Sequence, residues 1–281
     1  MQLPMFAPSI TWVAPNLDTL ADWPVNGRVA IDCETYDPKL KKLGVGVRRG
    51  GYVVGVSFSI EDGPTHYLPI RHQLGGNLPL EGVLSYLRGQ ARVFRGDIVG
   101  ANLQYDLDYL AAAGIVFTPR FFRYSQIADP LINELHNSYS LENISKRYGL
   151  QGKDSSSLVA AATEYGVDPK GGLWQLPAGH VGPYAERDAA LPLLISRRQE
   201  RVLEENGLWE IYNMESELLP ILVTLRQRGV LINQDKLAEV EKYALAEETK
   251  AVASIQQQTG IDIGGGNIMK AKLVAKAFDV A

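Results

Sequence analysis

The sequence predicts a mixed α/β fold that is followed by a helical extension, and three observations support this prediction. Short runs rich in β-branched and aromatic residues occur near the N-terminus. A strand-like run at 97–101 is followed directly by a helical pattern at 103–113, which is typical of an α/β layer. From about residue 125 the apolar residues recur mainly at helical spacing, so we expect helices to cover the sheet.

The predicted elements follow in chain order. Strands are expected at 28–34, 52–60 and 66–70, and three strands so early in the chain favour a mixed sheet. Helices are expected at 79–87 and at 103–113, and the second should end at Gly114, because glycine readily adopts the conformation that ends a helix. Later helical segments lie at 125–135, 140–149, 155–166 and 183–207.

A second region is expected to begin near Leu208. Two long amphipathic segments, at 208–229 and 234–260, are joined by the short sequence GVLIN, which favours a helical hairpin. The tail from 264 onward starts with a glycine run and holds one short helical pattern. We therefore predict two regions, at 1–207 and 208–281.

The composition excludes several classes of protein. Hydrophobic residues make up 46% of the 281 residues, which is enough for a sizeable core. The single cysteine, Cys33, excludes an intramolecular disulfide, and we expect it to be buried as a small apolar residue. No run approaches the length of a membrane span and the N-terminus lacks the pattern of a secretory signal, so we expect a cytoplasmic protein without a membrane partner.

The net charge of −4 has the wrong sign for a protein that binds nucleic acid through its overall charge. Any grip on a nucleic acid must therefore be local. The candidate is the glycine-rich stretch at 38–52, which carries Lys39, Lys41, Lys42, Arg48 and Arg49. It is interpreted either as a solvated, mobile loop or as a segment that grips a strand, and the sequence leaves both open.

The stretch AIDCETYD, at 30–37, places two acids at the end of an apolar run. Side chains alternate along a strand, so Asp32 and Glu34 should share one face while Ile31 and Cys33 share the other. Two neighbouring carboxylates repel each other unless one is protonated or a cation lies between them. The pair is either a solvated strand end or a metal or acid/base site.

Two further acids have informative spacings. In VGANLQYDLDYL, Asn102 and Asp106 lie at a strand-to-helix transition, where α/β sheets bind ligands. In PYAERDAA, Tyr184 and Asp188 are four residues apart in a helical segment, so both project from one face. Each has an ordinary alternative, since Asp106 could favour a helix N-terminus and the other two could be a surface pair.

Together these residues form the ordered series Asp32-x-Glu34, Asn102-x-x-Tyr105-Asp106 and Tyr184-x-x-x-Asp188. The series resembles the three motifs of the DEDD superfamily of 3′-5′ exonucleases, in particular the tyrosine-bearing branch that forms the proofreading domain of family A DNA polymerases. The histidine-bearing branch has histidine five residues before the last aspartate, where this chain has Pro183.

The flanking sequences extend the resemblance over most of the chain. Residues 128–149 resemble the segment between the second and third motifs, and residues 214–237 resemble the helix that leaves the exonuclease domain and the start of the polymerase thumb. The stretch at 38–52 is longer than the short turn of cellular members and is more like bacteriophage versions. The resemblance implies a ribonuclease H-like α/β domain.

The resemblance also implies a site for two divalent cations, Mg²⁺ or Mn²⁺, which hard oxygen ligands favour. Asp32 would contact both ions, Glu34 and Asp188 would complete the tighter site, and Asp106 would hold the second ion through water. Tyr184 would orient the attacking water.

Asn102 and Tyr105 would contact the last nucleotides of the substrate by the same resemblance, and Tyr36 is a candidate for stacking on a base. For Tyr36 and Tyr105, ordinary packing is the alternative.

The implied activity is a 3′-5′ exonuclease that releases nucleoside 5′-monophosphates from single-stranded or frayed DNA ends, in the cytoplasm of a bacterium or a phage-infected host. No sequence here resembles polymerase fingers or palm, so the expected partner is a polymerase module, either further along the same chain or in another subunit. A ribonuclease D-like RNA exonuclease and a catalytically inactive scaffold or DNA-binding module are the alternatives.

Overall fold

The computed structural model describes residues 8–152 and 155–280. The chain divides into two compact units after Gln227. None of the helices in the described ranges is sufficiently long and apolar to span a membrane.

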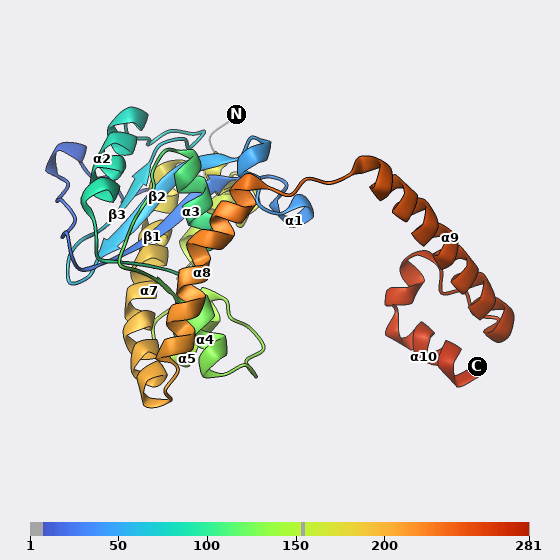
Figure 1. Cartoon of the computed structure of the whole chain (residues 1–281). Coiled ribbons are helices and arrows are strands. Elements are labelled where there is room, and N and C mark those ends of the chain that lie inside the picture. The colour runs from blue at the N-terminus through green and yellow to red at the C-terminus, as the bar shows by residue number, and fades with distance from the viewer. Residues whose placement is uncertain (1–7, 153–154, 281) are drawn as a thin grey trace. The chain divides into compact units, whose positions relative to one another are not determined.

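The first unit is built on a five-stranded mixed sheet (Figure 1). Its strands are β1 (Arg28–Tyr36), β2 (Tyr52–Ile60), β3 (Thr65–Pro69), β4 (Asp97–Gly100) and β5 (Phe121–Tyr124), in the spatial order β3-β2-β1-β4-β5. β2 pairs antiparallel with β1 and β3, whereas β4 pairs parallel with β1 and β5. The predicted mixed sheet is confirmed. The short edge strand β5 was not expected from the sequence.

The alternation along β1 assigns one set of side chains to each face of the sheet. Val29, Ile31 and Cys33 point into the largest apolar cluster, where they meet residues of α2 (Leu80–Val93) and α3 (Leu103–Ala112). Ala30 points to the other face, where it packs with Leu193 of α7 (Ala178–Glu205). Asp32 and Glu34 therefore share the α7 face, and Cys33 is buried on the opposite one, as predicted.

The remaining elements of the first unit are mostly short. Gly114 has a φ of 76° just beyond α3, in agreement with the expected helix end. The other helices are α1 (Leu40–Leu43), α4 (Ser125–Ile132), α5 (Leu141–Arg147) and α6 (Ser156–Glu164), with 3-10 turns at Leu17–Thr19 (η1), Val47–Arg49 (η2) and Leu173–Gln175 (η3).

The helix α8 (Trp209–Arg228) lies almost wholly in the first unit, so the compact unit extends beyond the boundary expected at residue 207. Its Leu219 and Val223 pack into the main core, and its Tyr212 is buried against Ala128 and Leu203. The Tyr212 hydroxyl accepts a hydrogen bond from the Tyr124 amide of β5 at 2.9 Å. These contacts join α8 to the sheet because its buried side chains recur on one helical face.

We expect Leu219→Ala to lower the free energy of unfolding of the first unit by about 2–5 kcal/mol, because it removes a fully buried side chain from the core. Leu222→Ala is the matched control, since Leu222 lies on the same helix but is 44% exposed. Urea unfolding of both variants checks the expectation. Equal losses for the two would show that α8 does not belong to the folding unit of the sheet.

The second unit contains α9 (Gln234–Thr259), the 3-10 turn η4 (Gly265–Met269) and α10 (Ala271–Val280). Asn233 caps α9 by accepting a hydrogen bond from the Lys236 amide at 3.0 Å. The two helices of the expected hairpin, α8 and α9, are thus present, but they belong to different compact units.

Candidate metal centre

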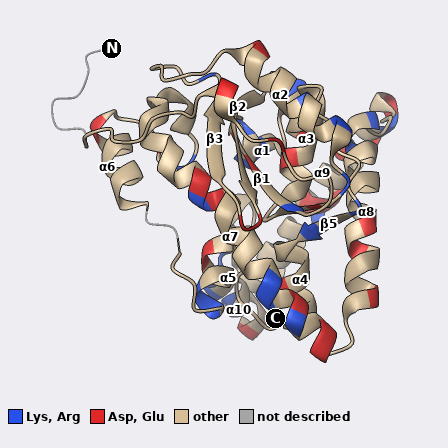
Figure 2. Cartoon of the chain, turned by 90° about the vertical axis from the view of Figure 1, so that its left-hand side faces the viewer, with Lys and Arg blue, Asp and Glu red and all other residues tan. Residues whose placement is uncertain are grey.

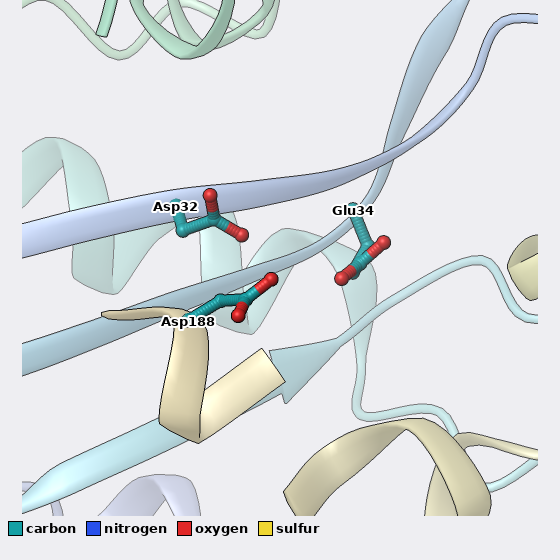
Figure 3. Close-up of side chains that lie close together, drawn as sticks. All are labelled: Asp32, Glu34 and Asp188. Atoms are coloured by element: carbon teal, nitrogen blue, oxygen red, sulfur yellow. The ribbon is translucent and has the colours of Figure 1, made fainter. Parts of the chain in front are cut away.

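Three carboxylates from two distant parts of the sequence meet on the α7 face of the sheet. Asp32 and Glu34 project from β1 and Asp188 projects from α7, and one oxygen atom of each lies within 4.8 Å of those of the other two (Figure 3). Three carboxylates this close repel one another unless protons or cations compensate the charge. Their hard oxygen atoms suit a divalent cation such as Mg²⁺.

Small residues bring α7 close to the strands. Ala185 and Ala189, on either side of Asp188, are fully buried. One turn earlier, a Cβ atom on Gly182 would lie only 2.2 Å from the indole of Trp12, so glycine is needed for this approach. Glu186 also fixes the helix, because its Oε1 accepts a hydrogen bond from the Tyr67 amide of β3 at 3.2 Å. The acid on α7 is thereby positioned against β1.

Asp106 lies beside this cluster but is not one of its three members. It is buried in the first turn of α3, and its Oδ1 accepts a hydrogen bond from the Cys33 amide at 3.1 Å. Burial, and next the negative charge of Asp32, raise the pKa of Asp106 well above its usual range. The fourth predicted acid is therefore close enough to interact electrostatically with the cluster.

Tyr184 lies one helical turn before Asp188, and their side chains are hydrogen-bonded. Burial is the main cause that raises the pKa of Tyr184, and the charge of Asp188 adds to it. The phenol is consequently protonated at neutral pH. A protonated phenol can both donate and accept a hydrogen bond, which suits it to hold a water molecule beside the carboxylates.

The three predicted substrate-contacting residues occupy different surroundings. Asn102 is exposed at the start of α3, and its Oδ1 accepts a hydrogen bond from the Tyr124 hydroxyl at 3.0 Å. Tyr105 is half-buried, and its hydroxyl lies 2.5 Å from that of Thr35 on β1. Tyr36 is half-buried and stacks on Tyr52, with ring centroids 4.9 Å apart. All three lie near the end of β1 or the start of α3.

The basic stretch is folded rather than extended, since it forms α1 and η2. Arg48 makes two hydrogen bonds to the buried carboxylate of Asp108 on α3, and Arg49 donates to the carbonyl groups of Leu43 and Gly44. These two arginines stabilise the fold and are not available to grip a strand. The ammonium groups of the stretch, on Lys39, Lys41 and Lys42, lie on its exposed side.

A buried histidine that the sequence did not single out supports the start of α7. The Nδ1–H group of His72 donates to the Leu176 carbonyl at 3.0 Å, because a carbonyl can only accept. Nε2 must then accept the 2.7 Å hydrogen bond from the Tyr67 hydroxyl. Burial lowers the pKa of His72 to about 4. The pair is His72 and Tyr67. Neither residue lies in a sequence motif, so there was no reason in the sequence to single them out.

We expect His72 to weaken the fold on acidification. Its pKa is about 6.5 in the unfolded chain and about 4 in the folded one, so the unfolded state binds the proton more readily. Stability from this group is complete above pH 6.5 and falls by about 1.4 kcal/mol per pH unit between pH 6.5 and 4. Denaturant unfolding of the wild type and His72→Gln across this range should show a steeper acid decline in the wild type. Parallel curves would contradict the assignment.

The chain is similar to known DNA polymerases. No family model matches the chain. A DNA-directed DNA polymerase of Pseudomonas phage M6 is 56% identical over 283 residues, which cover 99% of this chain and 43% of that polymerase. DNA polymerase I of Chloroflexus aurantiacus is 24% identical over 74% of this chain and 22% of its own length. The resemblance to family A DNA polymerases is confirmed. The chain spans less than half of the length of these relatives.

The predicted fold class is confirmed as well. The solved structure of Brucella melitensis NrnC with bound Mg²⁺ matches 76% of this chain and 90% of its own, with a TM-score of 0.50 and 22% identity. The first unit is thus a ribonuclease H-like α/β unit, as the resemblance implied. Its acidic cluster is compatible with divalent metal binding.

Proposed function

We propose that this chain is a metal-dependent 3′-5′ exonuclease module that acts on single-stranded or frayed DNA ends and releases nucleoside 5′-monophosphates. The observation that carries the proposal is the meeting of Asp32, Glu34 and Asp188 within 4.8 Å, with the Tyr184 hydroxyl hydrogen-bonded to Asp188. A proofreading role in DNA replication follows from the relationship to polymerases. The proposal also rests on the order in which five motif residues occur in the chain: Asp32, Glu34, Asp106, Tyr184 and Asp188.

The carboxylates are proposed to hold two ions, Mg²⁺ or Mn²⁺. Asp32, Glu34 and Asp188 would hold one ion. Asp106, which is buried beside them, would help Asp32 to hold the other. When bound, such ions activate water and stabilise the charge on the leaving 3′-oxygen. The Tyr184 phenol keeps its proton and orients the attacking water, since its raised pKa makes it a poor base.

Unpaired ends are the expected substrates. Opening a terminal base pair so that its phosphate can reach the carboxylates costs about 1.4 kcal/mol for each stacked step. Frayed or mismatched ends are therefore favoured. Asn102 and Tyr105, at the start of α3, are proposed to contact the last nucleotides.

A polymerase module is the proposed partner. The phage relative extends well beyond the part that this chain matches. The exposed side of α8 also carries a row of apolar side chains at helical spacing, as expected of a surface that another protein segment covers: Ile211, Met214, Leu218, Ile221, Leu222 and Leu225.

The test is incubation with Mg²⁺ and a 5′-labelled single-stranded DNA, with Asp32→Ala and a chelator as controls. A ladder that shortens from the 3′ end, and that both controls abolish, is expected. An RNA strand of equal sequence runs in parallel, and faster trimming of RNA would replace the assignment by an RNA 3′-end exonuclease. Folded protein that shortens neither strand would indicate an inactive scaffold.

A further inference from the structure

A hollow of about 440 Å³ lies between the end of β1, the helix α1 and the segment at 168–175. Trp174, Lys41 and Lys170 are among the side chains that line it. None of the three belongs to the motifs that predicted the metal site. The proposed metal site therefore does not account for the side chains that line this hollow.

A series of planar groups extends from this hollow across the end of β1. Trp174 meets Tyr36 edge-on, with ring centroids 4.7 Å apart and an interplanar angle of 86°. Tyr36 in turn stacks on Tyr52, and the guanidinium of Arg71 lies over the Tyr52 ring at 5.4 Å. Tyr36 is the last residue of β1 and follows Glu34 by two positions, with a register shift between Glu34 and Thr35. Tyr36 thus links Trp174, at the hollow, to the strand that carries Asp32 and Glu34.

The indole of Trp174 can take a further ring. One face of Tyr36 is covered by Tyr52, but Trp174 is half-buried and borders the hollow. Successive bases of a single strand stack on aromatic side chains of this kind with little regard to sequence, at about 1–3 kcal/mol per base. Such tolerance is what an enzyme that degrades any strand requires.

Two lysines and two aspartates line the hollow. Lys41 and Lys170 are exposed, and neither ammonium has an ion-pair partner within residues 8–152 and 155–280. The two acids of the rim are engaged locally. Asp37 accepts hydrogen bonds from the Gly46 amide and the Tyr109 hydroxyl, both at 2.8 Å, and Asp168 accepts one from the amide of Lys170 at 3.1 Å.

The position of Lys41 is fixed by the fold of the basic stretch. Asp37 and the Arg48–Asp108 pair tie the stretch to β1 and α3 on the two sides of α1. Elsewhere Lys and Arg are interspersed with Asp and Glu over the helices (Figure 2). Local placement of two ammonium groups beside an indole is therefore the feature that distinguishes this surface.

We propose that this hollow binds a nucleotide of the unpaired strand upstream of the scissile bond, with its base on Trp174 and its phosphates near Lys41 and Lys170. The proposal rests on the proposed exonuclease function, because it places the strand's 3′ end at the carboxylates. It assigns Lys41 of the basic stretch to the substrate, and Arg48 and Arg49 to the fold.

The first test is the dependence of cleavage on substrate length in the full chain with Mg²⁺. For the wild type, KM should fall as 5′-labelled DNA lengthens from two to six nucleotides. Trp174→Ala should raise KM for the six-nucleotide strand about tenfold, within what one stacked base contributes, and leave kcat and the dinucleotide unchanged. Trp174→Phe should restore most of the effect. Equal changes for both lengths, or none for either, would overturn the proposal.

The second test concerns the lysines. Lys41→Ala with Lys170→Ala should lower the slope of log affinity for the six-nucleotide strand against log salt by about 1.4, at about 0.7 for each phosphate contact. Lys39→Ala with Lys42→Ala removes the same charge from residues that do not line the hollow and should leave the slope near that of the wild type. If both double variants lower the slope equally, the effect comes from net charge alone, and the subsite is refuted.

The tests separate the subsite from the proposed activity. If the wild type cleaves no strand of any length, the exonuclease proposal fails, and fluorescence anisotropy with the labelled six-nucleotide strand still tests the hollow. Loss of binding in Trp174→Ala and in the lysine double variant would then support a binding site without cleavage. Unchanged binding in both would refute the subsite itself.

Discussion

Replacing Asp188 by asparagine is expected to lower kcat for 3′-end cleavage by roughly 10³-fold or more. The substitution keeps the shape of the side chain but removes one of three negative charges that lie within 4.8 Å. Cation binding there is expected to supply several kcal/mol of charge stabilisation in the transition state, and about 4 kcal/mol corresponds to a factor of 10³. Without a cation the same change relieves repulsion, so the variant should unfold at the wild-type temperature or above it.

Glu186→Gln provides the matched control for this prediction. It makes the same acid-to-amide change two residues away on α7, and a glutamine oxygen can still accept the hydrogen bond from the Tyr67 amide. Its kcat should remain within a few-fold of the wild type. Single-turnover rates with Mg²⁺ measure both variants, and thermal unfolding with and without Mg²⁺ measures cation binding. If Asp188→Asn cleaves as fast as Glu186→Gln, the carboxylate cluster is not the catalytic site.

Tyr184→Phe is expected to lower kcat about 10²-fold while KM and the stabilisation by Mg²⁺ stay near wild-type values. The substitution removes the hydroxyl that is hydrogen-bonded to Asp188 but leaves all carboxylates in place. Because the pKa of Tyr184 is raised above its usual 10, the wild type should show no alkaline loss of activity from this group below about pH 10. An unchanged kcat in the variant would exclude a role for the phenol in the reaction.

Tyr105→Phe is the control for Tyr184→Phe. It shows whether the loss of kcat is specific to the Tyr184 hydroxyl or follows from removing any tyrosine hydroxyl near the site. Its hydroxyl pairs with that of Thr35 at 2.5 Å, and Tyr105 is not a member of the carboxylate cluster. If Tyr105 contacts the substrate, as proposed, the variant should change KM more than kcat. A 10²-fold loss of kcat in both variants would indicate a general disturbance of the site instead.

Much of the first unit was predictable because its signals are local. The alternation in AIDCETYD placed Asp32 and Glu34 on one strand face and buried Cys33 on the other, and both predictions are confirmed. The helical spacing of Tyr184 and Asp188 likewise holds in α7. β5 and the true extent of the first unit were missed, because a four-residue edge strand and the packing of α8 depend on partners elsewhere in the chain.

The roles of the cations in the basic stretch could not be predicted from the neighbouring residues. Its five cations look alike in the sequence, yet Arg48 and Arg49 bind groups of the protein while Lys41 lines a hollow. Trp174 and His72 carried no signal for the same reason. Each acquires its surroundings from β1, β3 or α7, which the neighbouring residues do not specify.

By itself the sequence determined the faces of β1 and α7 and the chemical types that they present, because the backbone repeats of strand and helix fix which neighbours share a face. Only the tertiary structure decided that the two faces meet, that Asp188 comes within 4.8 Å of Asp32 and Glu34, and that an indole and two lysines border the same end of the sheet. Those outcomes depend on the packing of small residues such as Ala185 and Gly182 between segments far apart in the chain, and such long-range contacts leave no periodic trace in the sequence.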